Sequence, residues 1–254
     1  MIKLGCGPLR LLFDAKTMVL RLNGKKLVPS FTRTVGEMRS VMLSPHAAIP
    51  DSRICYWVYR RVERPTDKKL FNSRHLEYDV TVLAPAFLGP ERNKTLGHYH
   101  SLASDGIAYP EVYEVLFGQA HFLMQKRAAH ASKEVVDVRV VAANEGDKVI
   151  IEPGYGHVSI NASHEPLVLA NLLCTLNESD YSPYLEKRGA AYYEFGSEKF
   201  LPNPNYHKVP PLQVLKASSL KHAPKVGKEN LYADFLAGPH RYEFLRSPSR
   251  YWQA

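Results

Sequence analysis

Short apolar runs separated by turn residues characterise the first three quarters of the chain. Six stretches have the alternating or β-rich pattern of strands, namely residues 53–62, 76–84, 111–125, 135–143, 146–161 and 165–176. Gly118 divides the third stretch and a Pro-Gly pair divides the fifth, so each predicts two strands joined by a turn. Residues 10–42 add shorter runs that predict strands and hairpins. Strands at this regular spacing favour an all-β protein built as an antiparallel barrel or jelly roll.

The pattern changes from about Leu201, where proline becomes frequent and the strand signal ends. Residues 229–238 predict one short helix that ends before Pro239, because proline cannot continue a helix. We therefore expect residues 1–206 to form one barrel domain with N-terminal strands. Residues 207–254 are expected to form a C-terminal extension that packs on the barrel or on a partner subunit.

Composition places the chain among ordinary globular proteins. Hydrophobic residues make up 45% and charged residues 23% of the 254 residues. The three cysteines are far apart and form no CxxC pair, which argues against a disulfide framework and for a reducing, cytoplasmic location. The N-terminal segment lacks the apolar core of a signal peptide, and no apolar run reaches the roughly 18 residues of a membrane span.

The formal net charge is +8, and the last fifth of the chain contributes most of the excess. From Asn203 onward there are eight Lys or Arg and three Asp or Glu residues. No nucleic-acid-binding motif accompanies this charge, so we expect a solvated basic surface and no nucleic-acid partner. Attraction of a phosphorylated substrate is a second interpretation.

Three histidines and one glutamate have the spacing of a metal site. His98 and His100 are two residues apart, so in a strand both side chains point to the same face. Glu111 begins the next strand-like stretch after a turn-rich loop, and His157 lies in the stretch 146–161. Imidazole and carboxylate ligands suit iron, manganese, nickel, cobalt or zinc with positions left open for a substrate. These four residues are therefore the predicted metal ligands.

A His-x-His pair is weak evidence by itself, because two histidines on one barrel face can simply be exposed or paired polar residues. The glutamate and the third histidine make the pattern specific. The other eight histidines lack such a pattern and are not assigned to a metal: His46, His75, His121, His130, His164, His207, His222 and His240.

The sequences around these ligands resemble the two motifs of the cupins, each a strand, a turn and a second strand. More closely, Thr95–His100, Glu111–Tyr113 and Pro153–His157 are similar to the signature of the cupin-type, or archaeal-type, glucose-6-phosphate isomerases. The resemblance extends over about residues 8–206 and leaves the tail without a counterpart. It implies a cupin fold, that is, a double-stranded β-helix or jelly-roll barrel.

The resemblance also implies an activity. The chain would be a metal-dependent aldose–ketose isomerase that interconverts glucose 6-phosphate and fructose 6-phosphate in glycolysis and gluconeogenesis. One divalent ion per subunit is expected, Fe²⁺ first, with Mn²⁺, Ni²⁺, Co²⁺ or Zn²⁺ as alternatives, in a cytoplasmic homodimer. Whether mannose 6-phosphate is also a substrate stays open, because the two aldoses differ only in configuration at C2.

This reaction moves hydrogen between C1 and C2 and builds negative charge on an oxygen of an enediol. A metal ion can stabilise that charge as a Lewis acid. Glu111 is the only acidic ligand, so we assign it a second role as general base, with a metal-promoted hydride shift as the alternative. Tyr113 and Tyr155 are candidates for positioning sugar hydroxyls, with barrel packing as their alternative role.

The substrate phosphate carries about two negative charges and needs hydrogen-bond donors. By resemblance to the family, Thr81, Thr95 and the Gly97 backbone are expected to bind it, with Tyr181 as a further candidate. Thr81 is equally explained by the β-propensity of threonine. One departure bears on the sugar contacts, since a tyrosine of the family corresponds to Leu173 here.

Two alternatives belong to other functional classes. A different metal-dependent cupin enzyme, such as a dioxygenase or a decarboxylase, would keep the same four ligands without a phosphate pocket. A non-catalytic sugar-binding cupin would have no reason to keep all four ligands, so their presence argues against it.

Overall fold

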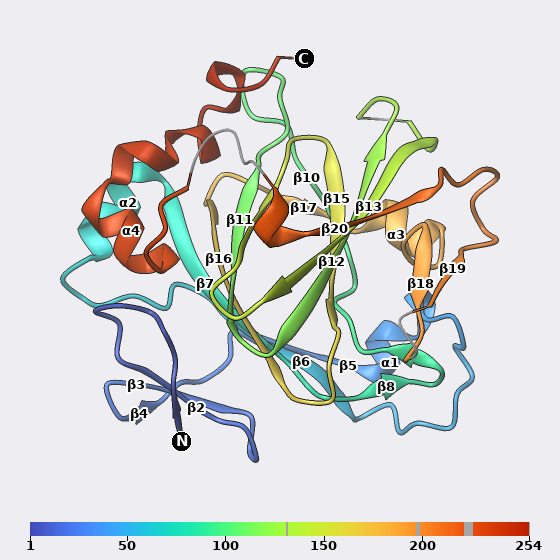
Figure 1. Ribbon diagram of the computed structural model, residues 1–254, viewed down its shortest axis with the longest axis horizontal. Helices are drawn as coiled ribbons and strands as arrows, with labels where there is room; N and C mark the ends of the chain where they lie inside the picture. Colours follow the sequence, from blue (N-terminus) through green and yellow to red (C-terminus); the bar gives the residue numbers. More distant parts are fainter. Residues whose placement is uncertain (131, 197–198, 221–225, 254) are drawn as a thin grey trace.

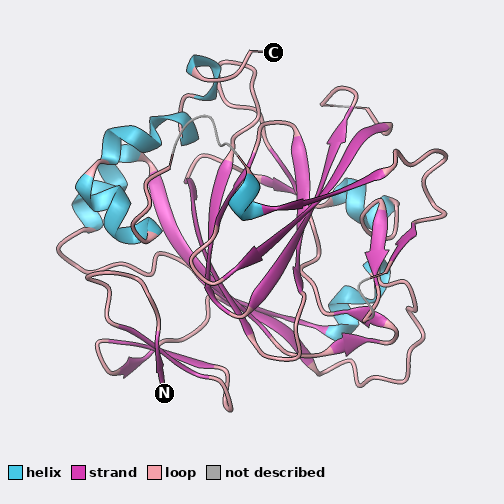
Figure 2. Ribbon diagram, in the orientation of Figure 1, coloured by secondary structure: helices cyan, strands magenta, loops and turns pink. Residues whose placement is uncertain are grey.

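Two facing β-sheets form the centre of the computed structural model, which describes residues 1–130, 132–196, 199–220 and 226–253 (Figures 1 and 2). The larger sheet has six strands in the order β14 (Lys148–Ile151), β11 (Glu111–Phe117), β16 (Leu167–Cys174), β7 (Leu76–Leu83), β6 (Ile54–Tyr59) and β5 (Phe31–Thr34). The smaller sheet has four strands in the order β15 (Tyr155–Asn161), β12 (Gln119–Arg127), β13 (Val135–Asn144) and β20 (Leu212–Lys216). All pairs in these sheets are antiparallel except β13 with β20.

This architecture confirms the prediction of an all-β, cupin-type fold, with two sheets that do not close into one continuous barrel. Each of the six predicted stretches contains a strand, and the third and fifth each contain two. Gly118 joins β11 to β12 at a φ of +86°, and a Cβ there would lie 2.5 Å from the Pro166 carbonyl oxygen. The turn therefore requires glycine for both its conformation and its close approach to another strand.

Shorter elements surround the two sheets. A small N-terminal sheet contains β1 (Ile2–Lys3), β2 (Leu11–Asp14), β3 (Val19–Leu22) and β4 (Lys25–Lys26). Three two-stranded pairs are β8 (Phe87–Leu88) with β9 (Glu91–Arg92), β10 (Tyr99–His100) with β17 (Ser179–Asp180), and β18 (Tyr192–Glu194) with β19 (Phe200–Pro202).

The helices are short and lie at the periphery, as the cyan ribbons of Figure 2 show. The α-helices are α1 (Val35–Met38), α2 (Lys68–Arg74), α3 (Ser182–Glu186) and α4 (Leu231–Ala237), and the 3-10 helices are η1 (Arg39–Val41), η2 (Ala217–Ser219), η3 (Pro239–Leu245) and η4 (Pro248–Arg250). The sequence pattern predicts only α4. Over the described parts of the chain, no helix is long and apolar enough to cross a membrane.

The six-stranded sheet is buried on both faces. Its inner face meets the four-stranded sheet, where Val115 of β11 and Phe122 of β12 belong to one apolar cluster. Its outer face carries Val80 and Val82 of β7 in a second cluster, which the N-terminal sheet and the C-terminal helices cover. Strand β7 is therefore buried along its whole length. The burial includes its polar residues Glu77, Asp79 and Thr81, which are unusual in such a strand.

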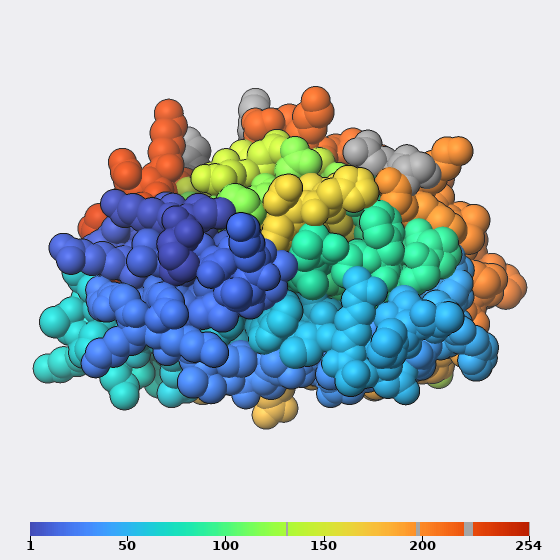
Figure 3. Space-filling model, turned by 90° about the horizontal axis from the view of Figure 1, so that it is seen from below, coloured from blue at the N-terminus to red at the C-terminus, as the bar shows by residue number. Residues whose placement is uncertain are grey.

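The C-terminal segment packs on both sheets of its own chain. Strand β20 extends the four-stranded sheet by parallel pairing with β13. Helices α4 and η3 lie against the outer face of the six-stranded sheet, beside α2 (Figure 1). The first quarter of the chain, in blue, forms much of the face seen in Figure 3. A domain boundary at residue 206 stays a prediction.

Glu114 of β11 fastens α4 to the sheet, because its carboxylate accepts a hydrogen bond from the Leu231 N–H at 2.8 Å. Burial raises the pKa of this carboxyl from 4.5 to about 7. The folded state then binds the proton more tightly than the unfolded state, so this group's contribution to the free energy of unfolding falls as pH rises from about 4.5 to about 7. Glutamine does not ionise, so Glu114→Gln removes this pH-dependent fall in the free energy of unfolding.

We therefore expect Glu114→Gln to gain stability relative to the native chain, on the order of 2 kcal/mol, between about pH 5 and about pH 8. Urea unfolding of both proteins at the two pH values measures this difference. An equal stability difference at both pH values would contradict the raised pKa.

Candidate metal centre

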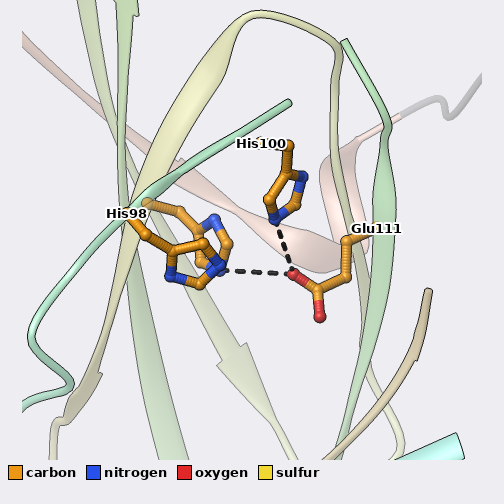
Figure 4. Close-up of side chains that lie close together, drawn as sticks. His98, His100 and Glu111 are labelled. Atoms are coloured by element: carbon orange, nitrogen blue, oxygen red, sulfur yellow. Dashed lines mark ion pairs between the residues drawn. The ribbon is translucent and has the colours of Figure 1, made fainter. Parts of the chain in front are cut away.

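Backbone pairing brings the four predicted ligands together. His98 and His157 face each other in an isolated antiparallel bridge. The His98 N–H donates a hydrogen bond to the His157 carbonyl, and the His157 N–H donates one to the His98 carbonyl. His100 lies in β10, and Glu111 is the first residue of β11. Figure 4 shows His98, His100 and Glu111 pointing toward one another, the two histidines from one segment and Glu111 from the start of β11.

The four side chains form a compact cluster, with one potential ligand atom from each lying within 4.8 Å of the others. The Glu111 Oε2 atom lies 3.3 Å from His100 Nε2 and 3.4 Å from His157 Nε2. The His98 and His157 ring centroids are 4.6 Å apart. Among the described residues, this is the only group of three or more His, Cys, Asp or Glu side chains with such a geometry.

The backbone fixes the orientation of His100. Its Nδ1 lies 2.7 Å from the Tyr109 carbonyl oxygen, which can only accept a hydrogen bond. Nδ1 therefore carries the proton, and the lone pair of Nε2 faces Glu111. Such a hydrogen bond on the far ring nitrogen is a usual feature of histidines that bind metals.

The donor atoms fit a divalent metal. Within the described part of the chain, His100 Nε2 and Glu111 Oε2, which face each other in the cluster, are buried without a hydrogen-bond partner. Burial, and then the neighbouring imidazoles, holds the pKa of His98 and His157 well below the usual value. These two rings are therefore neutral, and neutral imidazoles beside a carboxylate are the state that a cation requires.

Asn171 of β16 holds the glutamate in place and was not predicted from the sequence. Its Nδ2 donates a hydrogen bond of 2.7 Å to Glu111 Oε1, and both side chains are buried. Oε2 is therefore the oxygen that faces the histidines. A signal existed, because an asparagine interrupts the apolar run of β16, but its partner lies in another strand.

An open pocket with about 590 Å³ of empty space leads to the cluster. Its lining includes five of the six predicted substrate contacts, namely Thr81, Thr95, Gly97, Tyr113 and Tyr181. Leu173, which replaces the tyrosine of the resembling family, lines it as well. The pocket thus unites three of the four predicted ligands, His98, Glu111 and His157, with six positions that the sequence singles out.

Three of these positions are held by identifiable contacts. The Thr95 Oγ1 atom accepts a hydrogen bond from the Ser159 N–H at 3.0 Å, so its proton is free to be donated elsewhere. Gly97 has a φ of +91°, and a Cβ there would lie 2.5 Å from the Tyr184 ring. The Tyr181 ring centroid lies 5.4 Å from that of His98.

Tyr113 lies beside the metal ligands. Its hydroxyl is 3.2 Å from His157 Nε2. Burial and then the Glu111 carboxylate raise the pKa of Tyr113 well above its usual value, so the hydroxyl keeps its proton. It can therefore donate to a neighbouring nitrogen or to a substrate oxygen.

Tyr155 is not part of the pocket, contrary to the sequence-based expectation. Its hydroxyl donates a hydrogen bond of 2.5 Å to Asp137 Oδ2, and Arg139 lies 5.1 Å from its ring centroid. The Tyr155 side chain thus contacts two residues of β13, whereas His157, two residues further along β15, lines the pocket. The alternative role of Tyr155 in packing fits this position.

Two charged residues at the pocket wall were not predicted. Arg60 lines the pocket and pairs with Glu77 at 2.8 Å, which leaves 45% of its side chain exposed. Asp79 lies on the neighbouring strand, where burial and then Glu77 raise its pKa to about 7. Arginine and aspartate are too common on strand ends for such a role to be visible in one sequence.

Comparisons with known proteins identify relatives of this chain. The family model of glucose-6-phosphate isomerase (GPI) matches residues 32–211. The glucose-6-phosphate isomerase of Thermococcus onnurineus is 24% identical over 204 residues, which cover 78% of this chain and 96% of the relative. That of Thermococcus gammatolerans is 26% identical over 206 residues with the same coverage.

Solved structures give only a distant likeness. A vicilin from Solanum melongena is 16% identical with a TM-score of 0.35, over 49% of this chain and 30% of the vicilin. A Bacillus subtilis oxalate decarboxylase is 18% identical with a TM-score of 0.33, over 49% of this chain and 28% of that protein. The family match spans most of the chain and both halves of the ligand cluster, and the chain therefore belongs to the glucose-6-phosphate isomerase family of enzymes.

Proposed function

We propose that this protein interconverts glucose 6-phosphate and fructose 6-phosphate with one divalent metal ion held by His98, His100, Glu111 and His157. The observation that carries the proposal is the buried cluster of these four side chains at the end of an open pocket. Relatives named glucose-6-phosphate isomerase, aligned over 78% of the chain, support the choice of substrate.

A divalent ion bound here supplies a Lewis acid for the negative charge that develops on the substrate oxygens at C1 and C2. Fe²⁺ is the expected ion, with Mn²⁺, Ni²⁺, Co²⁺ or Zn²⁺ as alternatives, since three imidazoles and a carboxylate accept any of them. Asn171 and the Tyr109 carbonyl orient Glu111 and His100 toward the common centre. Orientation of this kind reduces the reorganisation needed during the reaction.

Glu111 is proposed to carry the proton between C1 and C2 as well as to bind the metal. Each carboxylate oxygen has two lone pairs, so the Asn171 hydrogen bond does not exhaust Oε1. Tyr113 is proposed to donate its hydroxyl proton to a sugar oxygen, because burial keeps it protonated. A hydride shift between the two carbons would need neither proton transfer.

The phosphate is proposed to bind at the side of the pocket formed by Thr81, Thr95, the Gly97 backbone and Tyr181. Hydroxyl and backbone N–H donors suit a phosphate in a partly enclosed site. The exposed part of Arg60 adds a positive charge at the same pocket. The activity would belong to glycolysis and gluconeogenesis in the cytoplasm, and the proposed homodimer is testable by light scattering.

A coupled assay tests the proposal. Fructose 6-phosphate is supplied with Mn²⁺ or Fe²⁺, and glucose 6-phosphate is detected through a glucose-6-phosphate dehydrogenase. We expect turnover that EDTA removes and added metal restores. Absence of metal-dependent glucose 6-phosphate formation would refute the proposal, and oxygen uptake on another substrate would point to a different cupin enzyme.

Asn171 offers a prediction about how the glutamate is positioned. Asn171→Leu should lower metal affinity by about 10-fold, because groups that orient a ligand typically contribute 10–100-fold. It should lower kcat more than it raises KM, since the Asn171 amide hydrogen-bonds Glu111, the proposed proton carrier. Calorimetric titration with Mn²⁺ and steady-state kinetics measure the two effects.

Asn171→Gln is the matched variant, because it keeps the amide on a longer side chain and should recover part of the metal affinity. Native metal affinity in Asn171→Leu would show that Glu111 needs no such partner.

A further inference from the structure

A second pocket, with about 570 Å³ of empty space, opens behind the strand that carries the metal-binding histidines. It shares no lining residue with the metal pocket. Tyr99, between His98 and His100, points into it, and Asp180 of the paired strand β17 lies on its wall. The β10–β17 pair therefore separates two pockets.

Arg127, at the end of β12, is the feature that sets this pocket apart. Its guanidinium lies 3.9 Å from the centroid of the Tyr99 ring. Its Nε atom is buried without a hydrogen-bond partner, and no described carboxylate pairs with the side chain. The Nε atoms of Arg33, Arg92 and Arg139 are likewise buried without a hydrogen bond, but each of these side chains lies in an ion pair with a carboxylate. A buried guanidinium nitrogen without an acceptor is costly unless a ligand supplies one.

The charged side chains that line the pocket are Arg127, Lys133 and Lys187, with Asp180 and Glu186 of opposite sign, which leaves an excess of one positive charge. Glu186 pairs with Lys133 at 2.7 Å. Asp180 Oδ1 accepts hydrogen bonds from the backbone N–H and the hydroxyl of Ser182. Lys187 donates to the Asn205 carbonyl at 3.3 Å and also lines the pocket. Among the described residues, neither Arg127 nor Lys187 lies in an ion pair, and the pocket as a whole keeps a net positive charge.

A buried amide fixes the aromatic wall on which Arg127 lies. Gln125 Nε2 donates to the hydroxyl oxygens of both Tyr99 and Tyr206 at 3.0 Å, and its Oε1 accepts from the Ala191 N–H at 2.8 Å. Gln125 is only 1% exposed. The ring under the guanidinium is thus held in place before any ligand arrives, which lowers the entropic cost of binding.

We propose that this pocket binds a small organic anion through a phosphate or carboxylate group. The planar guanidinium of Arg127 can donate two parallel hydrogen bonds to either group while it stays stacked on Tyr99. Lys187 provides a second charge, and the Ser132 and Ser182 side chains at the wall provide hydroxyls. The site is distinct from the proposed phosphate site and does not depend on the isomerase activity.

Isothermal titration of the metal-loaded protein with inorganic phosphate, and separately with succinate, tests the proposal. Arg127→Gln should weaken binding of at least one probe by about 10-fold, the effect of losing a charge-assisted hydrogen bond. Lys126→Gln is the matched control, since it removes the same charge from the same strand, but the Lys126 ammonium faces Tyr155. It should bind both probes within about twofold of the native chain.

The two probes and further variants separate the outcomes. Thr95→Val, in the metal pocket, should leave the Arg127-dependent binding component intact, whether or not the proposed isomerase activity exists. Arg127→Lys keeps the positive charge but loses the two parallel N–H donors of the guanidinium, so it should bind with intermediate affinity. Lys187→Gln is an independent variant that lies outside strand β12. If Arg127→Gln binds only phosphate more weakly, the ligand carries a phosphate group. If it binds both phosphate and succinate more weakly, the site accepts either group. Unchanged binding in Arg127→Gln and Lys187→Gln, or no binding of either probe by the native chain, would overturn the proposal.

Discussion

Replacing His157 by alanine should abolish metal binding and isomerase activity together. The imidazole is buried, its Nε2 lies 3.4 Å from Glu111 Oε2, and its backbone pairs with that of His98. Loss of one ligand should lower metal affinity by more than about 100-fold, because even groups that only orient a ligand contribute 10–100-fold. Loss of the Lewis acid removes several kcal/mol of transition-state stabilisation, so kcat/KM should fall by about 10³-fold or more.

His164→Ala is the matched control, because this histidine is exposed and outside the cluster. Metal content by atomic absorption, the coupled assay and circular dichroism should be measured on both variants. A folded His157→Ala protein with native activity would place the metal site elsewhere, even in the same fold.

Replacing Glu111 by glutamine should have the second largest effect. The amide has nearly the shape of the carboxylate but lacks its charge and its basicity. As a ligand it should bind the metal more weakly, and as a proton carrier it should be inactive, so kcat should fall by about 10³-fold even at saturating metal. Stopped assays at several Mn²⁺ concentrations separate the affinity effect from the effect on kcat.

Solvent deuterium distinguishes the two hydrogen-transfer routes. If Glu111 carries the proton, native turnover in D₂O should incorporate deuterium at C1 or C2, and Glu111→Gln should lose this exchange. Turnover without incorporation would favour a hydride shift and leave Glu111 as a ligand only. Activity of Glu111→Gln near the native level at saturating metal would contradict both roles.

The proximity of His98, His100 and Glu111 was predictable because these residues are close in the sequence. Two residues of the same parity in one strand share a face, which brings His98 beside His100, and a turn returns the chain to place Glu111 nearby. Asn171 was not predictable, because it reaches Glu111 only through the pairing of β11 with β16. Tyr155 does not line the pocket for a related reason, since its hydroxyl binds Asp137 of β13, a contact that strand parity does not record.

The secondary-structure elements also divide into those that local sequence patterns predict and those that depend on distant contacts. The strands follow alternation and turn residues, so their existence and approximate limits were predictable. Helix α2 was not, because only Phe71 is buried in it and that side chain depends on Tyr232 and Phe235 of the distant C-terminal segment. The pairing of β20 with β13 likewise depends on tertiary contacts of the C-terminal segment and could not be predicted from local sequence.

The most direct measurement of the central claim is a metal titration of the metal-free protein with activity and bound metal recorded in parallel. We expect conversion of fructose 6-phosphate to glucose 6-phosphate to rise in proportion to bound Mn²⁺ or Fe²⁺ and to level off at one ion per chain. The His157→Ala protein should show neither binding nor activity over the same range. Full activity of the metal-free protein, or saturation with metal without any isomerase activity, would contradict the account.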